Sequence, residues 1–490
     1  MSVSLIVVTG SVLKQRSETT IRKSVVRKLQ LVPGLGSGID AAMPTLGLSM
    51  IVKNEAATIG PCLESVRGIA SQIVIVDTGS TDDTVAIARK SGATVLCSPW
   101  ENNFANARNA ALAPITTDWV LSLDADEELD REAGPVLVTL LQKSAVAGYV
   151  LPVRNYTPAK DIRAGSSVGQ PNDFRHPRAA TAGSYFIYEK CRLFRRDPRI
   201  FFTGRVHEQV EVAIQAANLH LRPANPCIHN FGLLLAREGM GKKIVFYRDL
   251  LRLRVNEEPH DFRGWTYLGR MEYDSFNDRS EALRCFQRAL KLNPRCVEAL
   301  LFTAMIHLDL GRAQEALPFL DFIPPDQESG LQKHRLLGDA HSQLGQLEKA
   351  RGAYKHALKL SAENPELESK LGLIEVKLGM NKRGIARLEH TVTLFPPRID
   401  VHDRLMKAYM LANMLPEAAA AAERLSTLAV NPKAFLRAAS IRAHLKQWEE
   451  SKRLLERGLK LFPDAVNLLA AYSESVGHQQ QIDPMKCTSL

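Results

Sequence analysis

Residues 119–128 read Trp119-Val-Leu-Ser-Leu-Asp124-Ala-Asp126-Glu127-Glu128. The start of this stretch is mostly apolar, which predicts a short buried strand. The strand ends in paired aspartates followed by further acids. Ligands of open α/β sheets gather at the carboxyl ends of the strands, and paired carboxylates there suit Mg²⁺ or Mn²⁺ held partly by a substrate's phosphates. Taken alone, the stretch could also be a solvated acidic turn.

The chain before this stretch alternates predicted strands and helices. Strands are expected at 48–52, 73–76 and 94–97, with a helical pattern between them. This alternation is typical of a parallel sheet with right-handed crossovers. Polar residues follow three of the strands: Asn54 and Glu55, then Asp77, then Asp124 and Asp126. Because the carboxyl ends of parallel strands share one edge of a sheet, we expect these side chains to lie near one another.

Three segments carry a resemblance to a known family. They are Met50-Ile-Val-Lys-Asn-Glu-Ala56, Val74-Ile-Val-Asp77-Thr-Gly-Ser-Thr-Asp82-Asp83-Thr84 and Leu123-Asp124-Ala-Asp126-Glu127. Together, and in this order, they resemble the family 2 glycosyltransferases of the GT-A fold. The resemblance covers residues 46–235 and implies a Rossmann-like α/β domain that binds a nucleotide sugar.

The resemblance also implies roles for residues on the donor side. Asn54 and Glu55 would belong to the nucleotide-sugar site. Asp77 would accept a hydrogen bond from the base, usually uracil, whose N3–H a carboxylate can accept; a helix cap or turn former is the alternative. Arg108 would reach toward the nucleotide, with a surface ion pair on a helix as the alternative.

The aspartate pair would hold the cofactor of such a site. Asp126 would bind Mg²⁺ or Mn²⁺ on the diphosphate, and Asp124 would lie beside the ribose or the metal. A cation makes a nucleotide diphosphate a tolerable leaving group. His229, in Ile228-His-Asn-Phe-Gly232, could reach the diphosphate or the metal, although a histidine satisfied within the core is the alternative.

A second motif, Gly204-Arg205-Val206-His207-Glu208, resembles the His-Glu form of the acceptor motif in the same family branch. An inverting transfer needs a base beside the acceptor, and a carboxylate whose pKa is raised by partial burial can serve. Glu208 is therefore the expected base. His207 would orient it, would be a structural neighbour, or would itself be the base. The long segment 155–187 is rich in Gly, Ser, Pro and Asn and is expected to form a lid over the acceptor, with a disordered loop as the alternative.

A repeat begins near Asp261. A small residue recurs with a period of 34 or 33 residues, and a mostly large apolar residue follows it four positions later. The small residues are Ala282, Ala316, Ala350, Gly384, Ala418 and Ser451. The pattern resembles the tetratricopeptide repeat, a helix-turn-helix unit of this length. About six such units would stack into an all-α solenoid with a curved binding surface.

The expected organisation follows from these motifs. It comprises a mobile basic leader or an upstream mis-start (1–45), a GT-A domain (46–235), a linking amphipathic helix (236–261), the tetratricopeptide repeats (262–472) and a frayed tail (473–490). The leader carries six Lys and Arg residues against two acids. At 490 residues the chain is too long for one ordinary core.

Composition narrows the class of protein further. The net charge of +10 permits attraction to anions but identifies none. The seven cysteines form no C-x-x-C pair, which argues against a zinc site or a disulfide framework. No apolar run approaches the roughly 18 residues of a membrane span. We therefore expect no transmembrane segment and a cytoplasmic location, or a peripheral one at the inner face of the membrane.

These patterns predict an inverting, metal-dependent glycosyltransferase. It would move a sugar from a UDP-linked donor to a polypeptide or glycan acceptor, and the repeats would dock the acceptor or form a homodimer. No nucleic-acid partner is expected. The alternative is a catalytically silent nucleotide-binding scaffold whose repeats recruit protein partners. A nucleotidyltransferase is disfavoured because Asn54-Glu55 supplies no Gly-rich phosphate loop.

Overall fold

The computed structural model describes residues 43–482, apart from residues 144, 159–162, 165–166, 169, 236–239, 325–326 and 363. The predicted leader lies almost entirely outside these residues, as do the end of the predicted tail and part of the predicted lid. The chain forms two compact units, divided between Pro294 and Arg295. Each unit is described by itself.

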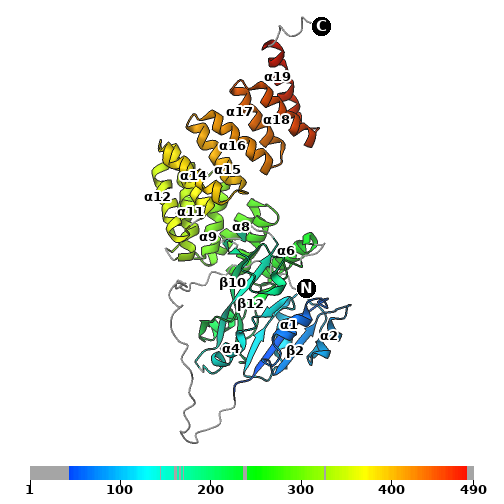
Figure 1. The fold of residues 1–490 in the computed structure, drawn as a ribbon. Coiled ribbons are helices and arrows are strands. Elements are labelled where there is room, and N and C mark those ends of the chain that lie inside the picture. Colours follow the sequence, from blue (N-terminus) through cyan, green and yellow to red (C-terminus); the bar gives the residue numbers. More distant parts are fainter. Residues whose placement is uncertain are drawn as a thin grey trace, which may run out of the picture. The chain divides into compact units, whose positions relative to one another are not determined.

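The first unit is built on a ten-stranded mixed sheet of order β3-β2-β1-β4-β10-β6-β12-β5, in which β11 pairs with β6 and β9 pairs with β10. Figure 1 labels β2, β10 and β12 of this sheet. One half is parallel and follows the predicted alternation. Its strands are β1 (Leu46–Val52), β2 (Gln72–Asp77), β3 (Thr94–Cys97) and β4 (Trp119–Ser122). β1 runs parallel to both β2 and β4, and β2 runs parallel to β3. The carboxyl ends of these strands therefore share one edge, as expected.

Helices cover both faces of β1, β2 and β4, whereas the edge strand β3 is largely exposed. The helices are α1 (Ile59–Ser65), α2 (Thr84–Lys90), α3 (Phe104–Leu112) and α4 (Ala133–Leu141). The alternate residues of β1 from Leu46 to Val52 pack in one cluster with α1 and α4, whereas Val120 of β4 packs in another cluster with α3. All four residues of β4 are buried. Burial on both faces explains why this strand is a continuous apolar run.

The other half of the sheet is largely antiparallel, which the alternation did not predict. Its strands are β5 (Glu127–Leu129), β6 (Gly148–Thr157), β9 (Gln170–Pro171), β10 (Ser184–Arg195), β11 (Leu221–Pro223) and β12 (Ile228–Asn230). β10 runs antiparallel to β4 and β6. The acids after Asp126 form a strand because β12 pairs with them, placing His229 opposite Glu128. Smaller elements are β7 (Arg163–Ala164), β8 (Ser167–Val168), η2 (Pro177–Ala179) and α5 (Glu211–Ala216).

The first helical repeat belongs to the same compact unit as the sheet. The unit ends with α6 (Met240–Glu257), α7 (Phe262–Asp274) and α8 (Arg279–Leu292). α6 occupies the predicted linking segment. Asp261 and Asp278 begin α7 and α8 by accepting hydrogen bonds from backbone N–H groups of the first turn. The buried residues of these helices form one apolar cluster with Val206, so the predicted acceptor motif and the first repeat share a core.

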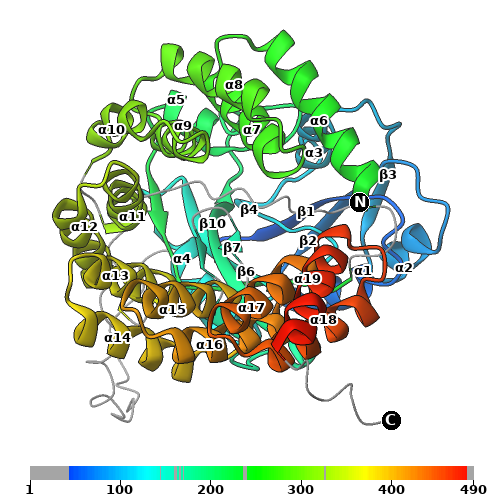
Figure 2. The same ribbon diagram turned by 90° about the horizontal axis from the view of Figure 1, so that it is seen from above.

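The second unit is all helical. Its helices are α9 (Val297–Asp309), α10 (Ala313–Asp321), α11 (Gln327–Gln343), α12 (Leu347–Leu360), α13 (Pro365–Lys377), α14 (Asn381–Leu394), α15 (Ile399–Leu411), α16 (Leu415–Leu428), α17 (Pro432–His444), α18 (Trp448–Leu461) and α19 (Val466–Ile482). Successive pairs in this unit follow a curved path (Figure 2). α19 extends past Tyr472, where the tail was expected to begin.

The small residues of the repeat lie in the second helix of each pair, and all are buried. They allow close helix contact. A Cβ atom added at Gly384 would meet the carbonyl oxygen of Gly372 on the paired helix at about 2.5 Å, so no larger residue fits without displacement of the backbone. The 34-residue pattern therefore reflects where the paired helices touch.

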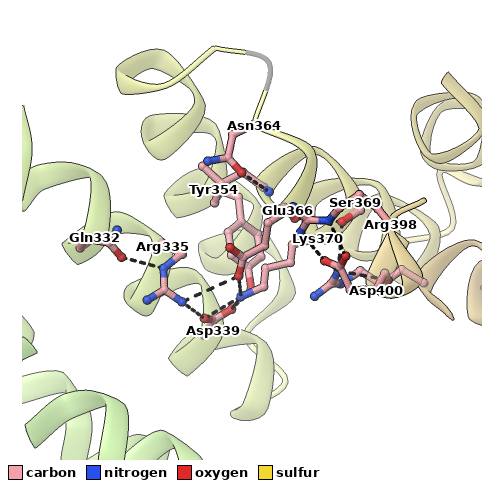
Figure 3. A network of polar contacts seen from close by, with 12 residues as sticks. Gln332, Arg335, Asp339, Tyr354, Asn364, Glu366, Ser369, Lys370, Arg398 and Asp400 are labelled. Carbon is pink, nitrogen blue, oxygen red and sulfur yellow. Dashed lines mark hydrogen bonds and ion pairs between the residues drawn. The ribbon is translucent and has the colours of Figure 1, made fainter. Parts of the chain in front are cut away.

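Polar contacts join neighbouring pairs in the second unit (Figure 3). The Lys370 ammonium group on α13 lies 2.6 and 2.8 Å from the Asp339 carboxylate oxygens on α11 and 3.0 Å from Glu366. Asp339 also accepts a hydrogen bond from the Tyr354 hydroxyl at 2.7 Å and pairs with Arg335 at 3.4 Å. Successive repeats are thus connected by ions that are largely shielded from water.

Replacing Lys370 with methionine should therefore destabilise the second unit. It would leave two shielded carboxylates short of a cation, which costs about 1–2 kcal/mol at a partly exposed site, less than the 3–5 kcal/mol of a fully buried pair. A thermal melt of the full chain should fall by a few degrees. Lys407→Met is the control, because Lys407 is 51% exposed in its pair with Asp403 and such pairs contribute little. Equal losses in the two variants would contradict the expectation.

Within the described residues, no helix is long and apolar enough to cross a membrane. All cysteines of that part of the chain are free thiols.

Candidate functional site

The predicted donor residues stand at the carboxyl edge of the parallel half-sheet. Asn54 and Glu55 follow β1, Asp77 ends β2, and Asp124 and Asp126 follow β4. The registers of β1 with β2 and with β4 bring these strand ends to the same side of the sheet. The topology therefore gathers at one edge the residues that were chosen from separate motifs.

Arg108 on α3 links the donor and acceptor motifs. Its side chain is almost fully buried. The guanidinium Nη2 lies 2.5 Å from Asp124 Oδ1, and Nε lies 2.6 Å from Glu208 Oε1. The Phe202 ring lies beneath the guanidinium, 5.5 Å away. One arginine thus brings a carboxylate of the predicted metal motif and the predicted catalytic base into the same buried site.

A second arginine, Arg192 on β10, extends this chain of charges. Its Nη2 lies 3.2 Å from Asp124 Oδ2 and 2.6 Å from Glu127 Oε1. Both oxygens of Asp124 are therefore engaged by arginines. Burial would raise the pKa of Asp124, but the two guanidinium groups outweigh it and lower that pKa, so Asp124 is ionised. In this arrangement Asp124 orders the site and has no oxygen free of a cationic partner.

Sequence reasoning missed Arg192 and its neighbour Lys190. Lys190 and Arg192 are separated by one residue on β10, but a shift in strand register between Cys191 and Leu193 interrupts the regular alternation of faces there, so the sequence spacing did not indicate their shared direction. The Lys190 ammonium adds positive charge near Glu208 and Asp124. Burial, followed by repulsion from Arg192, lowers the pKa of Lys190. Arg192 and Lys190 therefore add two cations to the carboxylates of this site.

Asp126 is the residue whose environment fits a cation. Both of its carboxylate oxygens are buried and lack a hydrogen-bond partner in the described structure. Burial and then the charges of Asp124, Glu127 and Glu55 raise the pKa of Asp126 well above its usual value. A divalent cation would relieve this concentration of negative charge. Asp126 therefore fits the predicted role of metal ligand.

The described residues supply few other ligands, since no group of three or more His, Cys, Asp or Glu side chains there is arranged to hold a metal ion. A cation at Asp126 would take most of its ligands from water and from a substrate's phosphates, as Mg²⁺ commonly does.

Gly232 makes room for the Asp126 carboxylate. A Cβ atom at position 232 would collide with Asp126 Oδ2. Gly232→Ala should therefore push that carboxylate aside and weaken metal-dependent binding of a nucleotide diphosphate about tenfold, since ligands must be held within about 0.5 Å. Isothermal titration calorimetry with UDP and Mn²⁺ measures this. Gly352→Ala, where the added Cβ meets nothing within 4 Å, is the control and should bind normally. Unchanged binding in Gly232→Ala would contradict the role of Asp126 as the metal ligand.

His229, the other predicted metal ligand, has partners on both ring nitrogens. Nδ1 lies 2.9 Å from the Tyr156 hydroxyl, and Nε2 lies 3.1 Å from Asp130 Oδ2. Burial is the main cause of the lowered pKa of His229. To bind a metal, the ring would have to give up one of these contacts, so the arrangement favours the alternative of a satisfied core histidine. The metal role of His229 stays a prediction.

Glu208 differs electrostatically from the expectation. We expected burial to raise its pKa. Burial does act in that direction, but the charges of Arg108 and Lys190 outweigh it, and the pKa of Glu208 is lowered. The expectation was wrong because it treated the carboxyl group without its partners. Glu208 is therefore ionised and able to accept a proton, although it is a weaker base than an unpaired glutamate.

His207 precedes Glu208 in an unusual backbone conformation, with φ of +53°. Its ring lies 4.6 Å from that of Tyr267 on α7. Burial and then the nearby charges of Arg270, Arg254 and Lys190 lower the pKa of His207 well below its usual value. His207 is therefore neutral and adjoins the first helical repeat, which favours a structural contribution over that of the base.

The residues after β1 and β2 hold one another. Asn54 has φ of +56°, and its Oδ1 accepts a hydrogen bond from the Thr81 backbone N–H at 2.7 Å. Asp77 accepts hydrogen bonds from the backbone N–H groups of Gly79 and Ser80 at 3.1–3.2 Å. Asp77 thus orders its own turn, as the alternative interpretation held, and a carboxylate retains further acceptor capacity.

Part of the predicted lid rests on the strand that follows Asp126. His176 Nε2 lies 3.3 Å from Glu128 Oε2, and Arg178 pairs with the other oxygen of Glu128. The described end of segment 155–187 is therefore anchored beside the acidic motif.

Comparisons with known proteins agree with this architecture. Residues 48–200 match the family described as Glycosyl transferase family 2. Residues 271–323 match Tetratricopeptide repeat, and residues 338–379 match TPR repeat. The chain therefore contains a family 2 glycosyltransferase domain followed by tetratricopeptide repeats, which confirms the predicted family and fold class.

Named relatives share parts of this arrangement. A TPR repeat-containing protein of Synechococcus elongatus is 31% identical over 283 residues, which cover 56% of this chain and 62% of that protein. An uncharacterized glycosyltransferase of Rickettsia felis is 42% identical over 90 residues, 18% of this chain and 31% of that protein. The glycosyltransferase SunS of Bacillus subtilis is 27% identical over 172 residues, 34% of this chain and 35% of that protein. The chain spans less than two thirds of the length of these relatives.

Proposed function

We propose that this chain is an inverting, metal-dependent glycosyltransferase that transfers a sugar from UDP to a polypeptide or glycan acceptor. The observation that carries the proposal is the double pairing of Arg108, which places Glu208 and Asp124 on either side of one buried guanidinium. Two motifs about 80 residues apart in the sequence thus share one site. A base beside an activated sugar is what such a transfer needs.

On the donor side, Asp77 would accept the N3–H of uracil, and Asn54 and Glu55 would shape the nucleotide pocket. Asp126, with both oxygens unpaired, would hold Mg²⁺ or Mn²⁺. When bound, the cation would neutralise charge on the departing diphosphate. The neighbouring cations of this chain, Arg108 and Lys190, would stabilise the same developing charge.

On the acceptor side, Glu208 would take the proton of the acceptor nucleophile. A bond forms from that nucleophile to the anomeric carbon while the bond from this carbon to the diphosphate oxygen breaks, and UDP leaves with the electron pair. Attack opposite the leaving group inverts the anomeric centre. An incoming diphosphate competes with Glu208 for Arg108, and loss of that ion pair would make Glu208 a stronger base.

Thermal unfolding with a panel of nucleotide diphosphates tests the donor. A ligand that binds only the folded state stabilises it by about 2.7 kcal/mol at 100 times its Kd. We expect UDP to raise the melting temperature only when Mn²⁺ or Mg²⁺ is present. A larger effect of guanosine diphosphate would overturn the choice of base, and an equal effect without metal would overturn metal dependence.

The competing candidate is a catalytically silent scaffold that binds a nucleotide and recruits partners through its repeats. The ion pair of Glu208 with Arg108 gives this candidate its support, because it lowers the pKa of Glu208 and so makes it a weaker base. Slow hydrolysis of UDP-sugars in the presence of Mn²⁺ distinguishes the two. Hydrolysis that disappears in Glu208→Gln supports the enzyme. Bound nucleotide without turnover supports the scaffold.

A further inference from the structure

The loop that carries Glu208 is closed at its base by hydrogen bonds between Thr203 and Gln209, at 2.9 and 3.0 Å. Three of its residues face the helices that follow the sheet domain. Arg205 pairs with Glu257 at the end of α6, Val206 lies in the apolar cluster of α6, α7 and α8, and His207 packs on α7. The loop therefore lies between the sheet domain and the helical extension, within one compact unit.

Arg254 on α6 is the centre of this contact. Its side chain is 4% exposed, and Nη1 donates a hydrogen bond to the carbonyl oxygen of Val206. Nη2 lies 2.7 Å from Asp261 Oδ2, the carboxylate that also begins α7. The Arg254 side chain also passes close to Gly204, which has φ of +92°. A Cβ atom at position 204 would lie 2.7 Å from the guanidinium. One buried arginine thus fixes the loop and the junction of α6 with α7 together.

Tyr267 on α7 holds the other end of the loop. Its hydroxyl accepts a hydrogen bond from Gln209 Nε2 at 2.7 Å. Its ring supports the His207 ring on one side and the Arg254 guanidinium, 5.7 Å away, on another. Tyr267 therefore contacts both sequence neighbours of Glu208, His207 and Gln209. The carboxylate of Glu208 itself pairs with Arg108.

We infer that Arg254 and Tyr267 are positioning residues for Glu208, so that the linking helix α6 and the first repeat helix α7 complete the acceptor side of the catalytic site. The inference rests on the proposed function and assigns to the helical extension a part in the chemistry. The contacts described for these two residues are to the loop at 203–209 and to the junction of α6 with α7, so their loss should change the rate of transfer and leave nucleotide binding intact. A displacement of about 1 Å in a reacting group can cost about 100-fold in rate.

The test uses the full chain with Arg254→Met, Arg254→Lys and Tyr267→Phe. We expect Arg254→Met to lower kcat for hydrolysis of the preferred UDP-sugar at least about tenfold, with UDP affinity within about twofold of the unmodified chain. Arg254→Lys should recover part of the rate, because an ammonium group can still reach Val206. Tyr267→Phe keeps the ring and should lose less than Arg254→Met. Arg252→Met is the matched control, since Arg252 on the same helix pairs with Glu272 on α7.

Hydrogen exchange separates this inference from the proposed function. In Arg254→Met, amides of residues 203–209 should exchange faster than in the control, while those of β1 and β2 should not change. Unchanged exchange in 203–209, or an equal loss of rate in Arg252→Met, would overturn the inference. A third outcome combines faster exchange in Arg254→Met with an unmodified chain that hydrolyses no nucleotide sugar. That outcome would support the contact between Arg254 and the loop but overturn the proposed function.

Discussion

Replacing Asp126 with asparagine should lower the turnover of nucleotide sugar about 1000-fold. The substitution keeps the shape of the side chain but removes a buried carboxylate whose two oxygens have no hydrogen-bond partner among the residues that the structure describes. Electrostatic stabilisation of a leaving group by a single well-placed partner is worth about 10²–10³ in rate. The stabilisation of the chain by UDP with Mn²⁺ in a thermal melt should be lost in the same variant.

A matched control separates this effect from a general change of charge. Asp83 is exposed and makes no side-chain hydrogen bond at the start of α2, so Asp83→Asn should bind and turn over UDP-sugar normally. The apo form of Asp126→Asn should also melt at or above the temperature of the unmodified chain, because one of several like charges has been removed. Retention of metal-dependent UDP binding would show that the metal lies elsewhere.

Replacing Glu208 with glutamine should lower turnover about 10²–10⁴-fold, the usual contribution of a general base. Affinity for UDP should not fall, because Glu208 pairs with Arg108 and the loss of its charge leaves that arginine freer for the diphosphate. The measurement is kcat alongside a UDP titration of the same preparation. A variant that loses UDP affinity and keeps kcat would assign Glu208 to donor binding instead.

The pH dependence adds a second readout for Glu208. The pKa of Glu208 lies below its ordinary value because Arg108 and Lys190 outweigh burial, so the ionised base persists to lower pH. The acidic limb of kcat/KM, which reports the free enzyme, should therefore lie below the ordinary glutamate value of about 4.3. Removing the nearby cation in Lys190→Met should move that limb to higher pH. A limb that stays in place would mean that another group controls it.

The sequence revealed the parallel half of the sheet and the repeat because both depend on local patterns. A continuous apolar run such as that of β4 indicates a strand covered on both faces, and the 34-residue spacing of small residues marks where paired helices touch. Asp124 and Asp126 were found for the same reason, since they stand directly at the end of a recognisable strand.

What the sequence hid depends on contacts between distant segments. Arg192 comes from an antiparallel strand whose place beside β4 no local pattern encodes. The pKa of Glu208 was misjudged because its sign is set by Arg108, 100 residues away. The boundary after residue 235 treated the first repeat as separate, whereas the compact unit continues to Pro294.

That last feature bears on how such chains can be recombined. A chimaera that joins a foreign solenoid directly after the sheet domain would lack the α6 and α7 helices that support the loop at 203–209. We expect its rate of transfer to be low even if it folds. A junction after Pro294 leaves the whole first unit intact. Exchange of helical repeats between enzymes of this architecture should therefore preserve activity only when α6, α7 and α8 come from the same protein as the sheet domain.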